Sequence, residues 1–176
     1  MKMKTGNSKI VFFTYAALLA FALLWVGGAV LAPLFETAPP EGGKAPLFIS
    51  PVYHVYGQVC HQIAERSFSL AGQPLAVCAR CLGIYVGALG ALMLYPSVRS
   101  LRRIDPPRRR WFIMALIPMA VDFAGDYLGF FENTLASRAI TGLIAGAAAA
   151  FYILPGLIGA AVEWFGTSRE AMRSDV

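Results

Sequence analysis

Three cysteines and one histidine are the side chains best suited to chemistry in this sequence. Cys78 and Cys81 form a C-x-x-C pair, and the adjacent residues Cys60 and His61 lie upstream of it. Thiolate and imidazole groups are the usual ligands of tetrahedral zinc, and an odd number of cysteines does not suit a framework of disulfides. The sequence therefore predicts a metal site, with zinc favoured, that uses Cys60, Cys78 and Cys81. His61 is the expected fourth ligand; three thiolates alone would leave an open site of the catalytic type.

The same three thiols also suit redox chemistry. A C-x-x-C pair at the amino-terminal end of a helix has its thiolate stabilised by the helix dipole and, here, by Arg80. Cys60 would exchange with the disulfide of the pair, and a quinone in the membrane would accept the electrons. An extracytoplasmic compartment permits such disulfides. A third interpretation, in which Cys78 and Cys81 are only small apolar residues at a helix start, is disfavoured because the three thiols cluster in the sequence.

Asp122 and Asp126 form the second group of candidate residues. They lie one helical turn apart in a largely apolar stretch, so they share one face of a helix. Carboxylates at membrane depth are costly and usually mark functional sites, although Arg138 is an obvious ion-pair partner if they are structural. With Arg66 and Arg80 expected at the same level, these residues predict a polar pocket beneath the metal, in which an aspartate moves a proton. A transport path through both aspartates is a further alternative.

The composition points to a membrane protein. Hydrophobic residues make up 57% of the 176 residues and charged residues 14%, whereas a soluble domain is about a quarter charged and a little under half apolar. The length allows about four spans with short loops, so we expect one membrane domain over residues 1–176. The net charge of +5 comes from clusters beside apolar stretches, which disfavours nucleic-acid binding and suggests orientation signals.

Four apolar segments predict the spans of an all-α integral membrane protein. Each is long enough to cross a hydrocarbon core of about 30 Å or nearly so; they run over residues of about 10–35, 82–98, 111–131 and 138–165. A shorter segment, Val52 to Ile63, is too short and too polar to span. We expect it to form an interfacial or re-entrant helix before the C-x-x-C pair.

The distribution of basic residues predicts the orientation. The connection 99–110 carries most of the arginines, and the amino terminus carries three lysines. Because Lys and Arg beside spans stay on the cytoplasmic side, we expect both termini and this loop to be cytoplasmic and the segment 36–81 to be extracytoplasmic. Glycines repeat every four residues at Gly83 and Gly87 and again at Gly142 and Gly146. Such stripes let helices pack closely, within one chain or in a homo-oligomer.

Four motifs resemble a known family. They are C-H-Q-x-x-x-R-S-F from Cys60, V-C-A-R-C-x-G-I-Y-x-G from Val77, P-M-x-x-D from Pro118 and R-x-x-T-G-L-I-x-G from Arg138. The pattern is similar to that of a family of prokaryotic membrane proteins known as domain of unknown function 2085. Ala64 replaces an expected proline and Leu82 an expected threonine, neither of which is a candidate ligand. The resemblance implies a multi-pass protein of a prokaryotic inner or plasma membrane and implies no activity.

These features together predict a small polytopic membrane protein with an extracytoplasmic Cys/His metal site above an Asp/Arg pocket. As an enzyme, it would use the metal to polarise a substrate or activate water. The arginines would favour an anionic or lipidic substrate, for example a lipid phosphate. The alternatives are a thiol–quinone oxidoreductase that uses the three cysteines, and a transporter or metal-handling protein that uses the two aspartates.

Overall fold

A computed structural model of the chain describes residues 8–35, 51–103 and 105–174. This part of the chain is mostly helical. The elements are α1 (Ser8–Leu31), the 3-10 helix η2 (Ala32–Phe35), α2 (Pro51–Gly57), the 3-10 helix η3 (Ala64–Arg66), strands β1 (Ser69–Leu70) and β2 (Gln73–Pro74), α3 (Ala79–Val98), α4 (Arg109–Tyr127) and α5 (Leu135–Ser174).

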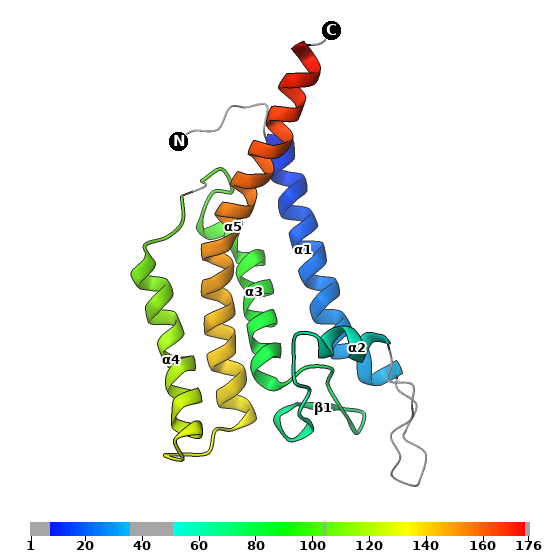
Figure 1. The fold of residues 1–176 in the computed structure, drawn as a ribbon, viewed down its shortest axis with the longest axis vertical. Helices are drawn as coiled ribbons and strands as arrows, with labels where there is room; N and C mark the ends of the chain where they lie inside the picture. The colour runs from blue at the N-terminus through cyan, green and yellow to red at the C-terminus, as the bar shows by residue number, and fades with distance from the viewer. Residues whose placement is uncertain (1–7, 36–50, 104, 175–176) are drawn as a thin grey trace.

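The four long helices lie side by side in the order α4, α5, α3, α1 across the view of Figure 1. The start of α1, the end of α5 and the connection between α3 and α4 lie at one end of the molecule. The short helix α2, the β1–β2 hairpin and the turn between α4 and α5 lie at the opposite end (Figure 1). We call these the arginine end and the thiol end, after the arginines of residues 99–110 and the three cysteines.

Three helices in the described part of the chain are long and apolar enough to cross a membrane: Ser8–Phe35, Ala79–Val98 and Leu135–Gly166. They correspond to three of the four predicted spans. The fourth predicted span, 111–131, forms α4 only as far as Tyr127 and is not in this set. The reason is its composition, since α4 carries Arg109, Arg110, Asp122 and Asp126. As a membrane crossing, α4 therefore stays a prediction.

Two other boundaries differ from the sequence-based expectation. Helix α2 ends at Gly57, whereas the predicted helix ran to Ile63; Gln62 adopts the left-handed conformation at φ 51°, which a continuing helix cannot contain. Helix α5 begins at Leu135 and continues to Ser174, beyond the predicted span in both directions.

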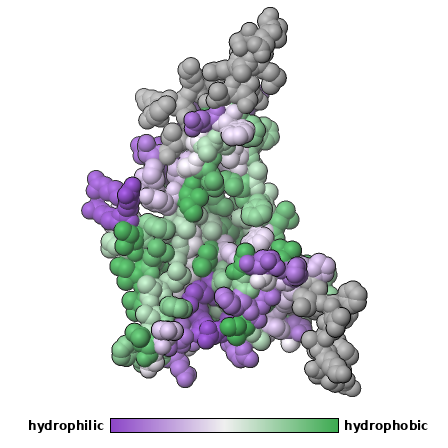
Figure 2. Space-filling model, in the orientation of Figure 1, coloured by the Kyte–Doolittle hydropathy of each residue, from purple (hydrophilic) through white to green (hydrophobic). Residues whose placement is uncertain are grey.

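The outer surface of the long helices is rich in apolar side chains. Large hydrophobic residues such as Phe13, Leu94, Ile117 and Ile140 are more than half exposed on four different helices. Figure 2 shows apolar side chains over the middle of the visible face and hydrophilic ones gathered toward the two ends. Extensive exposed apolar surface of this kind is what a lipid-facing bundle requires.

The two glycine stripes face each other in the contact between α3 and α5. A methyl group added at Gly87 would overlap the main-chain carbonyl of Leu143, and one added at Gly146 would overlap that of Ile84. Only glycine lets the two backbones approach this closely. Because both stripes are used inside one chain, they are not available to a second copy, and the proposed homo-oligomer contact through them has no support.

This contact predicts opposite effects of alanine at two glycines of the same helix. Gly87→Ala should destabilise the protein by about 1–3 kcal/mol, because a backbone carbonyl cannot move away from the new methyl group. Gly90→Ala should be neutral or stabilising by about 0.5–1 kcal/mol, since nothing lies within 4 Å of its added Cβ. Thermal unfolding of both variants in one detergent measures the difference, and equal midpoints would contradict the packing described.

Candidate metal site and buried ion pairs

The structure brings the three cysteines together at the thiol end. The Sγ atoms of Cys60, Cys78 and Cys81 all lie within 4.8 Å of one another, and all three thiols are free. Cys60 is buried, while Cys78 and Cys81 are partly exposed. Residues far apart in the sequence thus form one thiol cluster, as the motif predicted.

The start of α3 positions this cluster. Cys78 is the residue that precedes the first turn of α3, and Cys81 lies within that turn. The backbone N–H of Cys78 donates to the Sγ atom of Cys60 at 3.2 Å, which places the third sulfur at the amino-terminal end of the helix. N–H groups and the helix dipole at this position favour a negatively charged sulfur.

A hairpin returns the chain from Cys60 to Cys78. Strands β1 and β2 pair in antiparallel register, Ser69 with Pro74 and Leu70 with Gln73. The two turn residues both have positive φ, 53° at Ala71 and 80° at Gly72, as a two-residue hairpin of the primed type requires.

Side-chain hydrogen bonds fix this segment against the rest of the molecule. The Gln62 amide donates to the carbonyls of Tyr53 and Ala76, at 2.8 and 2.9 Å. The Tyr53 hydroxyl donates to the Pro74 carbonyl at 2.5 Å, and the Ala76 N–H donates to the carbonyl of Ala29 in α1 at 3.4 Å. Gln62 therefore links α2 to the residues that precede α3.

Aromatic side chains close the inner side of the cluster. The ring of Trp25 in α1 lies 4.7 Å from that of Tyr56 in α2 and 5.9 Å from that of Tyr85 in α3, measured between centroids. The Tyr56 hydroxyl donates to the Trp25 carbonyl at 2.5 Å. All three rings belong to the apolar cluster that includes Cys60. Such surroundings limit water access and strengthen electrostatic interactions with the sulfurs.

The charge on Cys78 follows from its neighbours. Hydrogen bonds with the thiol of Cys60 and then with that of Cys81 hold the pKa of Cys78 well below its ordinary value. Because the pKa of its thiol is lowered, Cys78 is a thiolate at neutral pH in the metal-free protein. A thiolate is the form that binds a metal ion or attacks a disulfide.

His61 does not join the thiol cluster in the described structure. Its side chain is exposed, and the group of neighbouring donor atoms found among the described residues contains the three cysteines alone. The neighbouring Cys60 side chain points into the apolar cluster, and adjacent side chains in irregular or extended backbone diverge. The fourth ligand expected from the sequence is thus not among the residues that the fold brings together.

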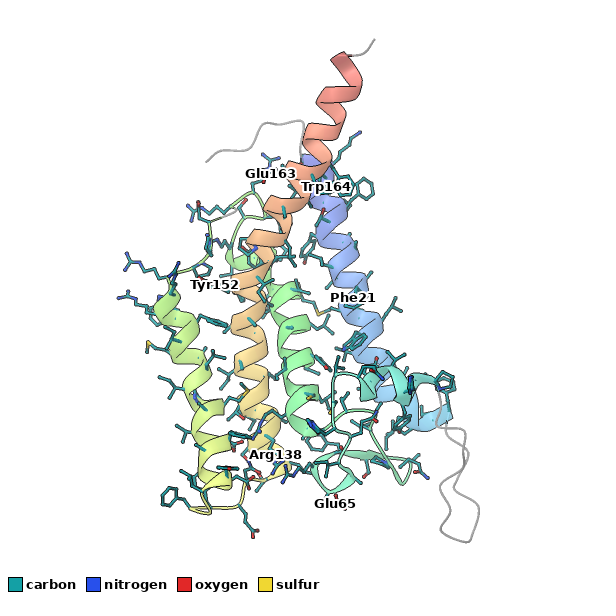
Figure 3. The ribbon with its side chains drawn as sticks, in the orientation of Figure 1. Phe21, Glu65, Arg138, Tyr152, Glu163 and Trp164 are labelled. Atoms are coloured by element: carbon teal, nitrogen blue, oxygen red, sulfur yellow. The ribbon has the colours of Figure 1, made fainter. Side chains whose placement is uncertain are left out.

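Both aspartates are ion-paired. A guanidinium nitrogen of Arg80 lies 2.5 Å from a carboxylate oxygen of Asp122, and one of Arg138 lies 3.3 Å from Asp126. Asp122 and Arg138 are buried. Figure 3 shows Arg138 at the same end of the bundle as Glu65, with Glu163 and Trp164 at the opposite end. The sequence suggested Arg138 as a partner, whereas the pairing of Arg80 with Asp122 was not foreseen.

Asn133 joins the two ion pairs. Its side-chain N–H groups donate to the carbonyl and a carboxylate oxygen of Asp122, at 3.3 and 3.2 Å. Its backbone N–H donates to Asp126 at 3.3 Å, and its amide oxygen accepts from Arg138 Nε at 2.5 Å. Sequence reasoning missed this residue because an asparagine in a short turn is common for local reasons.

The thiols and the ion pairs occupy different faces of α3. Cys81 packs with the aromatic cluster beside α1, while the neighbouring Arg80 reaches α4, where its guanidinium lies 5.6 Å from the Phe123 ring centroid. Successive residues on a helix point about 100° apart, which explains the divergence. Arg66, in η3, is exposed and has no carboxylate partner in the described part of the chain. The single site predicted from the sequence is therefore two adjacent groups.

The Arg80–Asp122 pair predicts a strong stability effect. Asp122→Asn should destabilise the protein by about 3–5 kcal/mol, because it leaves a largely buried guanidinium unpaired. The double variant Arg80→Met, Asp122→Leu should recover most of that loss, and Glu132→Gln, at an exposed carboxylate of the adjacent turn, should have little effect. Unfolding in detergent measures all three. An Asp122→Asn variant as stable as the parent would show that the pair is not structural.

Comparisons with known proteins match the part of the chain that contains these groups. The model of the family described as predicted membrane protein, domain of unknown function 2085 (DUF2085), matches residues 60–152. An uncharacterized protein of Methanocaldococcus jannaschii is 39% identical over 141 residues, which cover 80% of this chain and 90% of that protein. An uncharacterized protein of Methanothermobacter thermautotrophicus is 33% identical over 88 residues, 50% of this chain and 78% of that protein. No solved structure matches the chain. The resemblance inferred from the motifs is confirmed: the chain belongs to the DUF2085 family of membrane proteins.

Proposed function

We propose that this membrane protein holds a metal ion, zinc, through the thiolates of Cys60, Cys78 and Cys81. The observation that carries the proposal is the approach of three free thiols to within 4.8 Å of one another. Zinc–sulfur bonds of about 2.3 Å in a tetrahedron separate the sulfurs by about 3.8 Å, so small side-chain rotations would complete the site. A donor set of thiolates alone suits zinc and does not suit magnesium or calcium.

The site we propose has three protein ligands and an accessible fourth position. Cys78 and Cys81 are partly exposed, so a water molecule or a substrate could reach the open position. Bound zinc there supplies Lewis-acid activation of what occupies it. The protein contributes the Cys78 thiolate at neutral pH and a wall of aromatic rings that excludes water from the inner side. His61 would serve as the fourth ligand only if its ring turned inward from the surface.

We assign the two ion pairs to holding the bundle together. Asp122 and Asp126 each face an arginine at ion-pair distance, and this engagement argues against proton transfer or transport through them. Arg80 and Arg138 are engaged in the same contacts. Arg66 is exposed and lies between Cys60 and Cys78 in the sequence. Of the three arginines assigned to the polar pocket, it is therefore the one that would attract an anionic or lipidic substrate to the thiol end.

We also propose that α4 crosses the membrane as the fourth span. Its aspartates are the main obstacle to insertion, and their pairing with arginines of α3 and α5 lowers that cost. With four crossings, the arginine end would face the cytoplasm and the thiol end the exterior, since Arg and Lys beside spans remain inside.

A thiol–quinone oxidoreductase is the second candidate. The observation in its favour is the Cys78 thiolate beside the sulfur of Cys60. In that reaction the Cys78 thiolate and a neighbouring thiol would lose two electrons and one proton to form a disulfide. A membrane quinone would take up the two electrons, that proton and a second proton from water to become a quinol. The third thiol would remain for exchange.

The metal proposal predicts the content of the purified protein. Protein prepared without chelators should contain about one zinc per chain and no disulfide, as metal analysis and free-thiol counting would measure. Cys60→Ser, Cys78→Ser and Cys81→Ser should each release most of the zinc, because each removes one of three anionic ligands. His54→Ala, at an exposed histidine of the same region, is the matched control.

The same assay separates the alternatives. Retention of zinc in His61→Ala supports three protein ligands and an open position, while its loss would make His61 the fourth ligand. A disulfide between Cys78 and Cys81 in metal-free protein would overturn the metal proposal and favour the oxidoreductase.

The orientation predicts where added cysteines react. In a chain whose three native cysteines are replaced by serine, a membrane-impermeant maleimide added to intact cells should label Ser69→Cys, in the exposed hairpin, and should not label Ser100→Cys, in the arginine loop. Permeabilised cells should show labelling at both positions, which controls for reactivity. The reverse pattern in intact cells would place the thiol end in the cytoplasm.

A further inference from the structure

The arginine end contains a pocket that the proposed metal site does not use. It has a volume of about 490 Å³ and lies between the first turn of α1, the last turn of α3 and the residues that follow α3. We propose that this pocket binds the phosphate headgroup of an anionic phospholipid.

The cations of the pocket have no carboxylate partner among the residues that the structure describes. Arg99 and Arg102 both line it, and the ion pairs found in the described part of the chain involve neither of them. Arg99 donates from one terminal nitrogen to the main-chain carbonyl of Asp105, and its buried Nε has no hydrogen-bond partner among the described residues. Arg102 approaches the Ser8 hydroxyl at 3.5 Å. A phosphate oxygen is a strong acceptor for such guanidinium N–H groups.

The position of the pocket matches the level of lipid headgroups. The helices that border it, Ser8–Phe35 and Ala79–Val98, are two of the candidate membrane spans. The pocket lies where the first of them begins and the second ends. Headgroup phosphates lie at that boundary, beside the ends of the hydrocarbon core. Glu163, seen near this end in Figure 3, is not among the lining residues.

The lining combines groups for both parts of a phospholipid. The hydroxyls of Ser97 and Ser100 line the pocket with the two arginines and can donate to phosphate or glycerol oxygens. Phe12 and Val98 also line it and are 62% and 70% exposed, so they can contact acyl chains. Free phosphate would gain nothing from these apolar side chains, which is why a lipid is the ligand we favour.

Binding of short-chain lipids to the full-length protein in detergent tests the proposal. Dioctanoyl phosphatidylglycerol should bind at least tenfold more tightly than dioctanoyl phosphatidylcholine. Arg99→Gln and Arg102→Gln should each weaken phosphatidylglycerol binding about fivefold, the value of one basic residue near an anionic headgroup. Arg108→Gln and Arg110→Gln remove the same charge from exposed positions outside the pocket and should have less than about half that effect. Thermal unfolding confirms that each variant is folded.

Two further measurements distinguish the source of the phosphate and complete the test. Phe12→Ala should weaken phosphatidylglycerol binding and leave binding of inorganic phosphate unchanged. Inorganic phosphate binding as tightly as phosphatidylglycerol would overturn the assignment to a lipid. Equal losses in the pocket variants and in the Arg108 and Arg110 variants would also overturn it, because attraction would then be spread over the whole loop. Neither result depends on whether the thiols bind zinc.

Discussion

The close backbone contact between α3 and α5 is the interaction on which the rest of the structure depends. Within a bilayer, helices gain no hydrophobic free energy from associating, so close packing of small residues must hold them together. Gly83, Gly87, Gly142 and Gly146 permit that approach. The contact also sets the relative height of the two helices: the main-chain carbonyl of Arg80 lies against Gly142. The start of α3, where Cys78 precedes the first turn and Cys81 lies within it, is thereby fixed beside the start of α5.

The remaining elements are attached to this pair by different forces. Helix α1 packs through aromatic and aliphatic side chains, with Trp25 at the thiol end and Val11 at the arginine end. Helix α4 packs against α5 and is joined to α3 by a buried ion pair. Charges in an apolar environment must be paired, so the arginines that neutralise Asp122 and Asp126 also determine where α4 lies. Asn133 completes this arrangement from the turn between α4 and α5.

The sequence predicted those features that depend on local spacing. The C-x-x-C pair, its place before a helix, the three long apolar helices and the shared face of the two aspartates all follow from short-range periodicity. The direction of an individual side chain did not follow. His61 is exposed because Cys60 takes the buried direction, and the end of α2 at Gly57 depends on the clamp that Gln62 makes with Tyr53 and Ala76. The Arg80–Asp122 pair joins residues on separate helices. Such a pairing depends on which helices are neighbours in space, and the spacing of residues along the sequence does not give that. The separation of the thiols from the aspartates on two faces of α3 has the same origin, because neighbouring residues of α3 face different helices.

The pairing of Arg80 with Asp122 also bears on how the chain is made. Arg80 is synthesised well before Asp122, so α3 must enter the bilayer while its arginine still lacks a counter-charge. Arg80 lies in the first turn of α3, and its long side chain can extend to the surface in the meantime. The carboxylate of Asp122, more than one turn inside the end of α4, has no such reach. With α4 as the fourth span that we propose, its insertion needs α3 to be in place already, and the charges set the order in which the two helices insert. Insertion of α4 before α3 would bury an aspartate with no partner.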